Sequence, residues 1–333
     1  MMRGVGILAV LAAAMVLPFV LGNDFYINMA SQVLIYALTA CGLNLLIGFG
    51  GMTSLGHAAY LGISAYACAW LSTNAGWPAL PAALAALAIG TASAAVFGVL
   101  ALRAAGLGFM MITLALGMIV WGMAYRWVGL TGGDNGIRLQ TYPTPFGFDV
   151  SQPMPFYYFT LCVFVLAFTV IWLISRSPFG ACLKGTRDQP RRMRMLGHNV
   201  WLIRWTAFIL AGFWGSLAGL MYIYYHKFVS PQSIHLQQSA EVLLMVILGG
   251  PSSLFGPLVG AAVITLVKNV VSTYVDRWYS LLGLIFIVTV LFMPQGIVPG
   301  CQQIWRKITG RGRTKAVMGT PQANKAPIGN HAS

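Results

Sequence analysis

The sequence has few charged residues, and acidic residues are the scarcest of them. Charged residues make up 8% of the 333, with six Asp or Glu against 20 Lys or Arg. Soluble domains carry about 25% charged residues. This shortage, together with 58% hydrophobic residues and a mean hydropathy of +0.76, excludes a soluble globular protein. Alternating segments of about ten residues, typical of a membrane barrel, are also absent. We therefore predict an all-α, polytopic helical membrane protein.

Motifs for catalysis are missing as well. The chain has no G-x-x-x-x-G-K-[ST] phosphate-binding loop and no Gly-Lys dipeptide. It has no H-E-x-x-H, no C-x-x-C and no pair of carboxylates suited to acid–base work. The cysteines share no metal-ligand spacing and are interpreted as small packing residues; they are Cys41, Cys68, Cys162, Cys182 and Cys301. We expect no enzymatic activity, no cofactor and no metal site.

The net charge of +14 is concentrated in two segments. Seven of the 20 Lys and Arg residues lie within residues 176–204, and six follow Cys301. Segments rich in Lys and Arg stay on the cytoplasmic side of a membrane. No recognised nucleic-acid module accompanies the charge. The distribution therefore predicts membrane topology, with both segments cytoplasmic, and no nucleic-acid partner.

Ten apolar runs predict about ten transmembrane segments, within a range of eight to ten, and both termini in the cytoplasm. The runs cover about 5–22, 28–48, 55–73, 79–102, 107–128, 155–175, 204–225, 238–250, 255–273 and 278–294. The first is interpreted as a span because no signal-peptide cleavage site follows it. The short run at 238–250 is a candidate re-entrant half-helix. We predict a transmembrane domain over 1–300 and a disordered, basic cytoplasmic tail over 301–333.

Two glycine-rich turns echo each other 199 residues apart. Residues 50–55 read GGMTSL and residues 249–254 read GGPSSL, and each stands between two apolar runs. Their shared chain direction favours two parallel pseudo-repeats, a common transporter plan, over unrelated Gly and Ser turns. We interpret both turns as broken-helix positions along a solute pathway, with the candidate residues Gly50, Gly51, Ser54, His57, Gly249 and Gly250.

Ionisable residues inside the apolar runs are few, and the candidates are His57, Glu241 and Lys268. A charge at the bilayer centre costs about 2.5–3.5 kcal/mol on insertion scales. Glu241 opens a run and Lys268 lies near an outer end, where its long side chain reaches the interface. His57 is expected to hydrogen-bond carbonyls freed by the neighbouring turn. Proton coupling is disfavoured because a proton relay needs more acids.

Small residues recur every fourth position in two runs. They are Ala82, Ala86, Gly90, Ala94 and Gly98 in one run, and Ala207, Ala211, Gly215 and Gly219 in the other. Such stripes let helices approach closely in lipid. They fit either a dimer contact or packing within the subunit, and we favour the second.

The basic segment 176–204 also carries the signals of a short helix. Asp188 suits a cap, Pro190 a first turn and Gly197 a C-terminal stop. These signals predict a helix over about 189–196 that presents Met193 and Leu196 among arginines. A charged loop without a partner would explain the charge alone. The capping signals favour a helix that a cytoplasmic partner grips.

A set of motifs follows in a fixed order over about residues 28–300. They are G-L-N-L-L-I-G (42–48), S-L-G-H-A-A-Y (54–60), L-T-G-G with G-I (130–133, 136–137), S-P-F-G (177–180), R-D (187–188), L-G with N (196–197, 199), V-S-P (229–231), E-V-L-L-M (241–245), L-G-G (248–250), F-G-P (255–257) and M-P-Q-G (293–296). In these motifs the chain resembles the permease subunits of branched-chain amino acid ABC importers, the Liv type, and especially the M-type subunit.

The resemblance implies a permease subunit in the cell inner membrane that translocates a small polar solute. Branched-chain amino acids are the first expectation, and urea, amides or another small solute are the alternative. The implied partners are a second permease in a heterodimer, two cytoplasmic ATP-binding subunits and a periplasmic solute-binding protein. A rival from another class is an ion-coupled secondary carrier, which the shortage of intramembrane acids disfavours.

The resemblance further implies that 187–199 contains the helix that docks into an ATP-binding subunit. The residues assigned to this coupling are Arg187, Asp188, Arg191, Arg192, Arg194, Leu196 and Gly197. The family usually has small and acidic residues between the Arg-Asp and Leu-Gly elements, where this chain has Pro190 and three arginines. The departure fits either an ATP-binding subunit with a more acidic groove or a divergent paralogue.

Overall fold

The structure is a computed structural model that describes residues 23–139, 152–251 and 253–271. It also describes residues 15, 18, 280, 283, 284, 287, 291 and 296–301. Most of the first and last predicted runs, 5–22 and 278–294, and nearly all of the 301–333 tail lie outside the described residues. The predictions made for them are not tested.

The described chain is helical almost throughout, as its composition predicts. The apolar helices are α2 (Asp24–Asn44) with η1 (Leu45–Phe49), α3 (His57–Thr73), α4 (Ala79–Ala101), α5 (Leu107–Arg126), α7 (Pro153–Arg176), α10 (Val200–His226), α11 (Leu236–Gly249), and α12 (Gly256–Leu266) with η5 (Val267–Val271). Each predicted run between 28 and 273 coincides with one of them to within a few residues. Among the described residues, five helices are long and apolar enough to cross a membrane: α2 with η1, α4, α5, α7 and α10.

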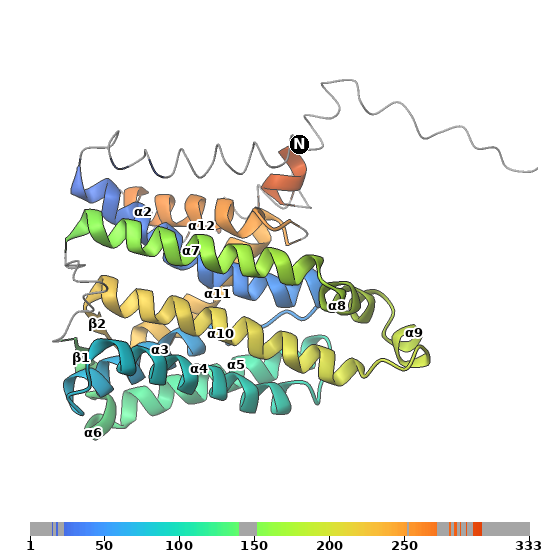
Figure 1. Ribbon diagram of the computed structural model, residues 1–333, viewed down its shortest axis with the longest axis horizontal. Coiled ribbons are helices and arrows are strands. Elements are labelled where there is room, and N and C mark those ends of the chain that lie inside the picture. The colour runs from blue at the N-terminus through green and yellow to red at the C-terminus, as the bar shows by residue number, and fades with distance from the viewer. Residues whose placement is uncertain are drawn as a thin grey trace, which may run out of the picture.

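The two ends of the bundle differ in structure (Figure 1). At one end, which we call the connector end, α8 (Pro178–Asp188) and α9 (Pro190–Met195) join α7 to α10. At the other, the ribbon end, β1 (Ile137–Arg138) pairs with β2 (Phe228–Val229). The pairing is antiparallel, with Ile137 opposite Val229. Short helical turns complete the ribbon end: α6 (Val128–Thr131), η2 (Gly133–Asn135) and η4 (Pro231–Ile234).

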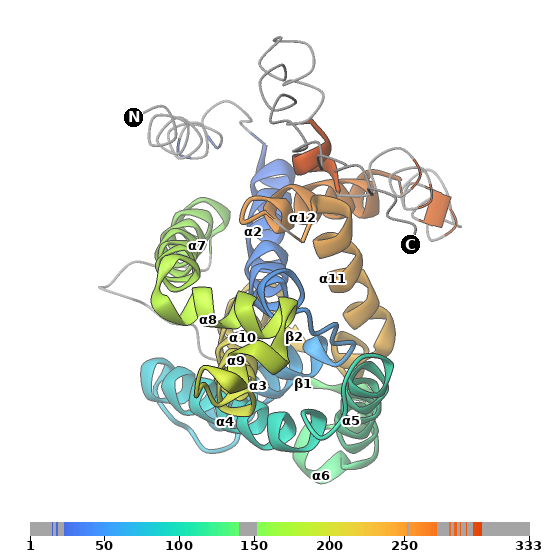
Figure 2. The ribbon, with the colours of Figure 1, turned by 90° about the vertical axis from the view of Figure 1, so that its right-hand side faces the viewer.

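Helices α3 and α10 occupy the centre of the bundle, surrounded by α2, α4, α5, α7 and α11 (Figure 2). The small-residue stripe of α4 explains how α10 approaches it, while the stripe residues Gly215 and Gly219 of α10 pack against α3. Gly90 of α4 packs against Ser216, and Ala94 packs against Gly212, with no room for a Cβ on either glycine. The stripes therefore serve packing within the subunit, as favoured from the sequence.

Candidate functional site

Helix α8 is an element that we did not predict from the sequence. Ser177 caps it by accepting a hydrogen bond from the Gly180 N–H, and Pro178 occupies its first turn. The helix buries Leu183 and Thr186 against the bundle. The Ser-Pro pair is the signal that could have identified this helix, but we identified it only as part of the S-P-F-G motif of the family resemblance.

Helix α9 confirms the predicted short helix. Pro190 stands in its first turn, and Gly197 follows it with φ +82°, a backbone conformation that favours glycine. The cap prediction is wrong, because the N-cap position belongs to Gln189 and no side chain caps the helix. Asp188 instead ends α8 and pairs with Arg187, Oδ1 to Nε at 2.9 Å.

Helix α9 is largely exposed, since none of its residues is buried. Met195 is 86% exposed and Leu196 is 67% exposed. Arg191, Arg192 and Arg194 are also exposed. Met193 differs from the prediction, because it turns inward and its sulfur packs over Gly185 of α8. The exposed surface of α9 is therefore basic with two apolar side chains.

Arg187 points into the protein rather than away from it. Its Nη1 donates a hydrogen bond to the Gly48 carbonyl at 2.5 Å, and its methylene groups pack over Gly51. The last carbonyls of a helix have no partner within the helix, so the end of η1 can accept this bond. Lys184 adds a second contact, with its ammonium 4.8 Å from the centre of the Phe49 ring. Helix α8 is thus fastened to the end of η1.

The two glycine turns meet at the connector end. Asn44 Nδ2 donates to the Ser253 carbonyl at 3.1 Å, and Gly48 packs so closely on the Pro251 carbonyl that a Cβ would not fit. Gly51 and Gly250, 199 positions apart, both have positive φ, +66° and +107°. Helices α3 and α12, which follow the turns, also begin 199 residues apart.

The two glycine turns also have similar local hydrogen bonds. Ser54 accepts a hydrogen bond from the Gly56 N–H, and Ser253 accepts one from the Gly256 N–H. Gly50, Gly249 and Gly250 are buried, whereas Gly51 is exposed. The structure therefore brings most of the predicted turn residues together, and they lie beside the Arg187 contact.

His57 is fully buried, at 0% exposure, as the first residue of α3. The prediction that it bonds carbonyls of the turn is wrong, because neither ring nitrogen has a partner at hydrogen-bonding geometry among the described residues. The ring lies between Gly42 and Gly215 and forms an edge contact with Tyr60 at 5.5 Å. His57 packs into the interior next to the turn.

A polar cluster lies nearer the ribbon end, inside the helices. Glu241 is 3% exposed, and its Oε2 accepts from Lys268 Nζ at 2.8 Å. Asn269 Nδ2 donates to Gln32 Oε1 at 2.8 Å. We define the Glu241 cluster as Gln32, Tyr36, Gln238, Glu241, Lys268 and Asn269. We had considered Glu241 and Lys268 separately, although opposite charges on two helices joined by a tight turn could have indicated the pair.

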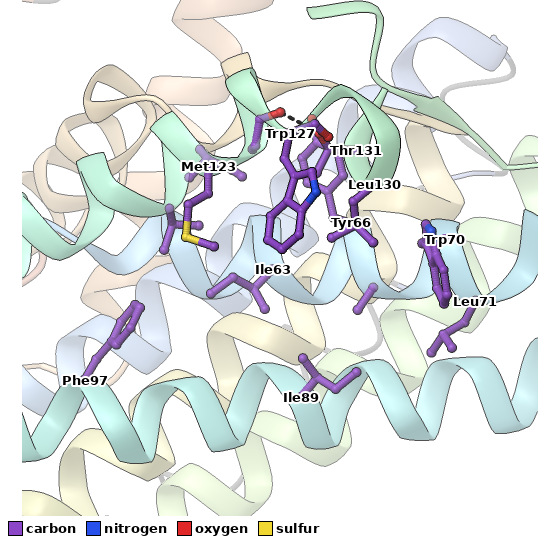
Figure 3. Close-up of a pocket in the computed structure, with 14 residues that line it drawn as sticks. Ile63, Tyr66, Trp70, Leu71, Ile89, Phe97, Met123, Trp127, Leu130 and Thr131 are labelled. Carbon is purple, nitrogen blue, oxygen red and sulfur yellow. Dashed lines mark hydrogen bonds between the residues drawn. The ribbon is translucent and has the colours of Figure 1, made fainter. Parts of the chain in front are cut away.

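An apolar cavity lies between α3, α4 and α5 (Figure 3). Its volume is about 540 Å³, and Ile63, Trp70, Met123 and Trp127 contribute to its lining. Its lining offers no charged group to a charged solute, unlike the connector end and the Glu241 cluster. Among the described residues, no group of three or more His, Cys, Asp or Glu side chains could hold a metal ion.

Apolar helices of membrane-spanning length, interrupted by one basic connector and enclosing a polar cluster, define a polytopic membrane permease. The family described as "Branched-chain amino acid transport system / permease component" matches residues 25–292, and the chain belongs to this family.

Curated relatives agree with this family. The chain is 28% identical over 319 residues to the high-affinity branched-chain amino acid transport system permease protein LivM of Salmonella typhimurium (strain LT2), covering 88% of this chain and 74% of that protein. It is 29% identical to LivM of Escherichia coli (strain K12), with the same coverage. The autoinducer 2 import system permease protein LsrC of Salmonella paratyphi B is 27% identical, covering 66% of this chain and 64% of that protein. No solved structure matches the chain.

Proposed function

We propose that the chain is the permease subunit of an ATP-binding-cassette importer for branched-chain amino acids. The observation that carries the proposal is the family match over residues 25–292, joined to the exposed basic connector. The relatives named as branched-chain amino acid permeases support this solute. The chain has no phosphate-binding loop, so ATP hydrolysis belongs to separate subunits and this subunit is not an enzyme.

Helix α9 is the surface that docks onto an ATP-binding subunit. Its three arginines, Arg191, Arg192 and Arg194, suit a groove lined with carboxylates, because guanidinium groups bind carboxylates in a bidentate manner. The exposed Met195 and Leu196 suit an apolar floor in the same groove. Gly197 ends the helix and lets the chain turn back to α10.

The contacts of α8 provide a route from this surface into the bundle. Arg187 holds the Gly48 carbonyl at the end of η1, and Asn44, one turn earlier, holds the Ser253 carbonyl of the second glycine turn. A displacement of α9 therefore acts on both glycine turns. Arg187 and Asp188 accordingly position the connector, while the α9 arginines contact the partner.

We infer the orientation of the subunit in the membrane from the distribution of its positive charge. We place the connector end in the cytoplasm, because it carries the basic segment, and the ribbon end on the outer side of the inner membrane. The full subunit then has about ten spans with both termini cytoplasmic, a transmembrane domain over 1–300 and a cytoplasmic tail over 301–333. The paired glycine turns support two parallel pseudo-repeats with an offset of 199 residues.

The working transporter comprises this chain, a second permease in a heterodimer, two ATP-binding subunits and a periplasmic solute-binding protein. Each of the two ATP-binding subunits needs a connector to dock on, and this chain supplies one of the two. The glycine turns, which include Gly50, Gly51, Gly249 and Gly250, lie where the helices bordering a solute pathway are broken.

The test is reconstitution of the complex with candidate ATP-binding subunits and L-leucine. We expect co-purification, stimulated ATP hydrolysis and ATP-dependent leucine uptake. An Arg191→Ala/Arg192→Ala/Arg194→Ala variant should lose most stimulated hydrolysis, whereas Arg103→Ala, a cation elsewhere at the connector end, should not. Uptake by the purified chain alone, driven by an ion gradient, would overturn the proposal in favour of a secondary carrier. Uptake of urea or an amide in place of leucine would overturn the assignment of branched-chain amino acids as the solute.

A further inference from the structure

We propose that the Glu241 cluster is a binding site for the charged groups of a zwitterionic solute, an α-amino acid, as it crosses the subunit. Lys268 takes the solute carboxylate and Glu241 takes its ammonium group. The inference rests on the proposed function, which it deepens by assigning residues to the solute.

Charge conservation is the first argument for this assignment. In the structure, Lys268 Nζ and Glu241 Oε2 are 2.8 Å apart and neutralise each other. When a zwitterion enters, one ion pair is replaced by two, and no charge is left uncompensated at any stage. A buried charge without a partner is costly, so exchange of partners is the route by which a charged solute can pass apolar helices. A neutral solute would gain nothing from opening the pair.

The position of the pair is the second argument. Glu241 lies five residues after the start of α11, which places it about 8 Å inside the helix at 1.5 Å per residue. Its side chain is 4% exposed, while that of Lys268 is 28% exposed. Lys268 is therefore accessible and Glu241 sits deeper. Buried ion pairs add little to stability compared with apolar residues, and ionisable groups within a membrane usually mark a solute pathway.

The cluster also has a buried hydroxyl group without a partner. Thr265 Oγ1 forms no hydrogen bond within the described part of the chain, and the Gln238 side chain lies beside Tyr36. Thr265 is 1% exposed and shares a helix face with Lys268 and Asn269, three and four residues later. Gln238 likewise lies three residues before Glu241. A buried polar group needs a partner, and the carboxylate of an amino acid would supply one.

A polar cavity lies at the ribbon end, and one of its lining residues is one helical turn from the cluster along α2. Its volume is about 380 Å³, and Asn28 and His226 contribute to its lining. Asn28 lies one turn before Gln32 on α2, and His226 lies within electrostatic range of Lys268. Small-molecule sites occupy about 300–1,000 Å³, so this volume can admit an amino acid. Tyr36 and Tyr222 lie near Glu241 as well.

The experiment uses the whole transporter in proteoliposomes with its solute-binding protein, ATP and radiolabelled L-leucine. Two double variants keep the net charge: Glu241→Gln/Lys268→Met removes the pair, and Glu241→Lys/Lys268→Glu reverses it. A control, Asp24→Asn/Arg126→Gln, removes one exposed acid and one exposed base from the ribbon end. Readouts are co-purification with the ATP-binding subunits, ATP hydrolysis, and leucine imported per ATP hydrolysed.

We expect both double variants to assemble and hydrolyse ATP like the unmodified protein, but to import at least about tenfold less leucine per ATP, the size of one or two lost charged hydrogen bonds. The control should import normally. If the reversed pair restored import, or if either variant imported normally, the pair would be structural and the inference overturned. Loss of assembly in both variants would overturn it too. Failure of the unmodified protein to assemble or to import leucine would instead overturn the proposed function.

Discussion

The two ends of the bundle hold their charges in opposite ways. Near the ribbon end, the Glu241–Lys268 pair lies inside the helices, with side chains 4% and 28% exposed. At the connector end, the Arg187–Asp188 pair lies at the surface, with side chains 40% and 62% exposed, and the arginines of α9 are exposed as well. The interior of the connector end is held instead by side-chain hydrogen bonds to carbonyls, from Arg187 and Asn44, and by the close contact of Gly48 with the Pro251 carbonyl.

This difference suits the two ends to different roles, solute recognition and the transmission of displacement. A side-chain ion pair can exchange its partners for those of a solute without moving a helix. Close packing of one backbone segment on another leaves no room for independent movement, so it transmits displacement from one helix to the next. Recognition therefore suits the ribbon end and force transmission suits the connector end. Four substitutions probe this comparison, beginning with the largest expected effect.

The buried pair should show strong coupling between its two members. Lys268→Met leaves the Glu241 carboxylate buried without its partner and should lower the free energy of unfolding by about 3 kcal/mol. The double variant with Glu241→Gln should recover most of that loss, because no charge remains to be compensated. Thermal unfolding of the purified subunit in detergent measures both. Equal losses in the single and double variants would show that the two side chains act independently.

The backbone contact at the connector end should tolerate almost no added volume. Gly48→Ala places a methyl group against the Pro251 carbonyl and should cost about 1–3 kcal/mol of unfolding free energy, the range for overpacking. Gly122→Ala in α5 is the matched control, since no atom lies within 4 Å of the added Cβ. It should be neutral or slightly stabilising. Similar melting temperatures for the two variants would contradict the close contact.

The inward arginine should differ from its outward neighbours. Arg187→Met removes the hydrogen bond to the Gly48 carbonyl while keeping the methylene groups over Gly51, and should cost about 1.5 kcal/mol. Arg191→Met should change the unfolding free energy by less than about 0.5 kcal/mol, because the side chain is exposed. Stimulated ATP hydrolysis should fall in both variants, for different reasons. If Arg191→Met lowered the free energy of unfolding as much as Arg187→Met, the two arginines would not differ in their contribution to stability.

The surface pair should contribute least. Asp188→Asn should cost less than about 1 kcal/mol, and the cost should shrink further as salt is added, because the pair is exposed and screened. Melting curves at low and high ionic strength test this directly. The difference between the stability losses of Asp188→Asn and Lys268→Met tests the comparison between the two ends most directly.

Sequence patterns predicted the features that depend on neighbouring residues. The apolar runs between 28 and 273 marked the helices, and Pro190 and Gly197 marked the limits of α9, because these signals act within a few residues. Partners distant in the chain were not predictable in this way. Asn44 bonds Ser253, which lies 209 positions later in the chain, and neither local sequence indicates this partner. Glu241 and Lys268 were assessed one at a time, although both belong to the same helical hairpin.

The lack of buried residues in α9 has a consequence for how such transporters diversify. A substitution there breaks no core contact, so the folding of the subunit does not constrain the choice of side chain at positions 191, 192 and 194. Under the proposed docking of α9, selection on that stretch acts through the ATP-binding subunit. The same docking would let paralogous importers within one cell acquire distinct, non-interchangeable ATP-binding subunits by altering a few codons, while the membrane bundle stays the same.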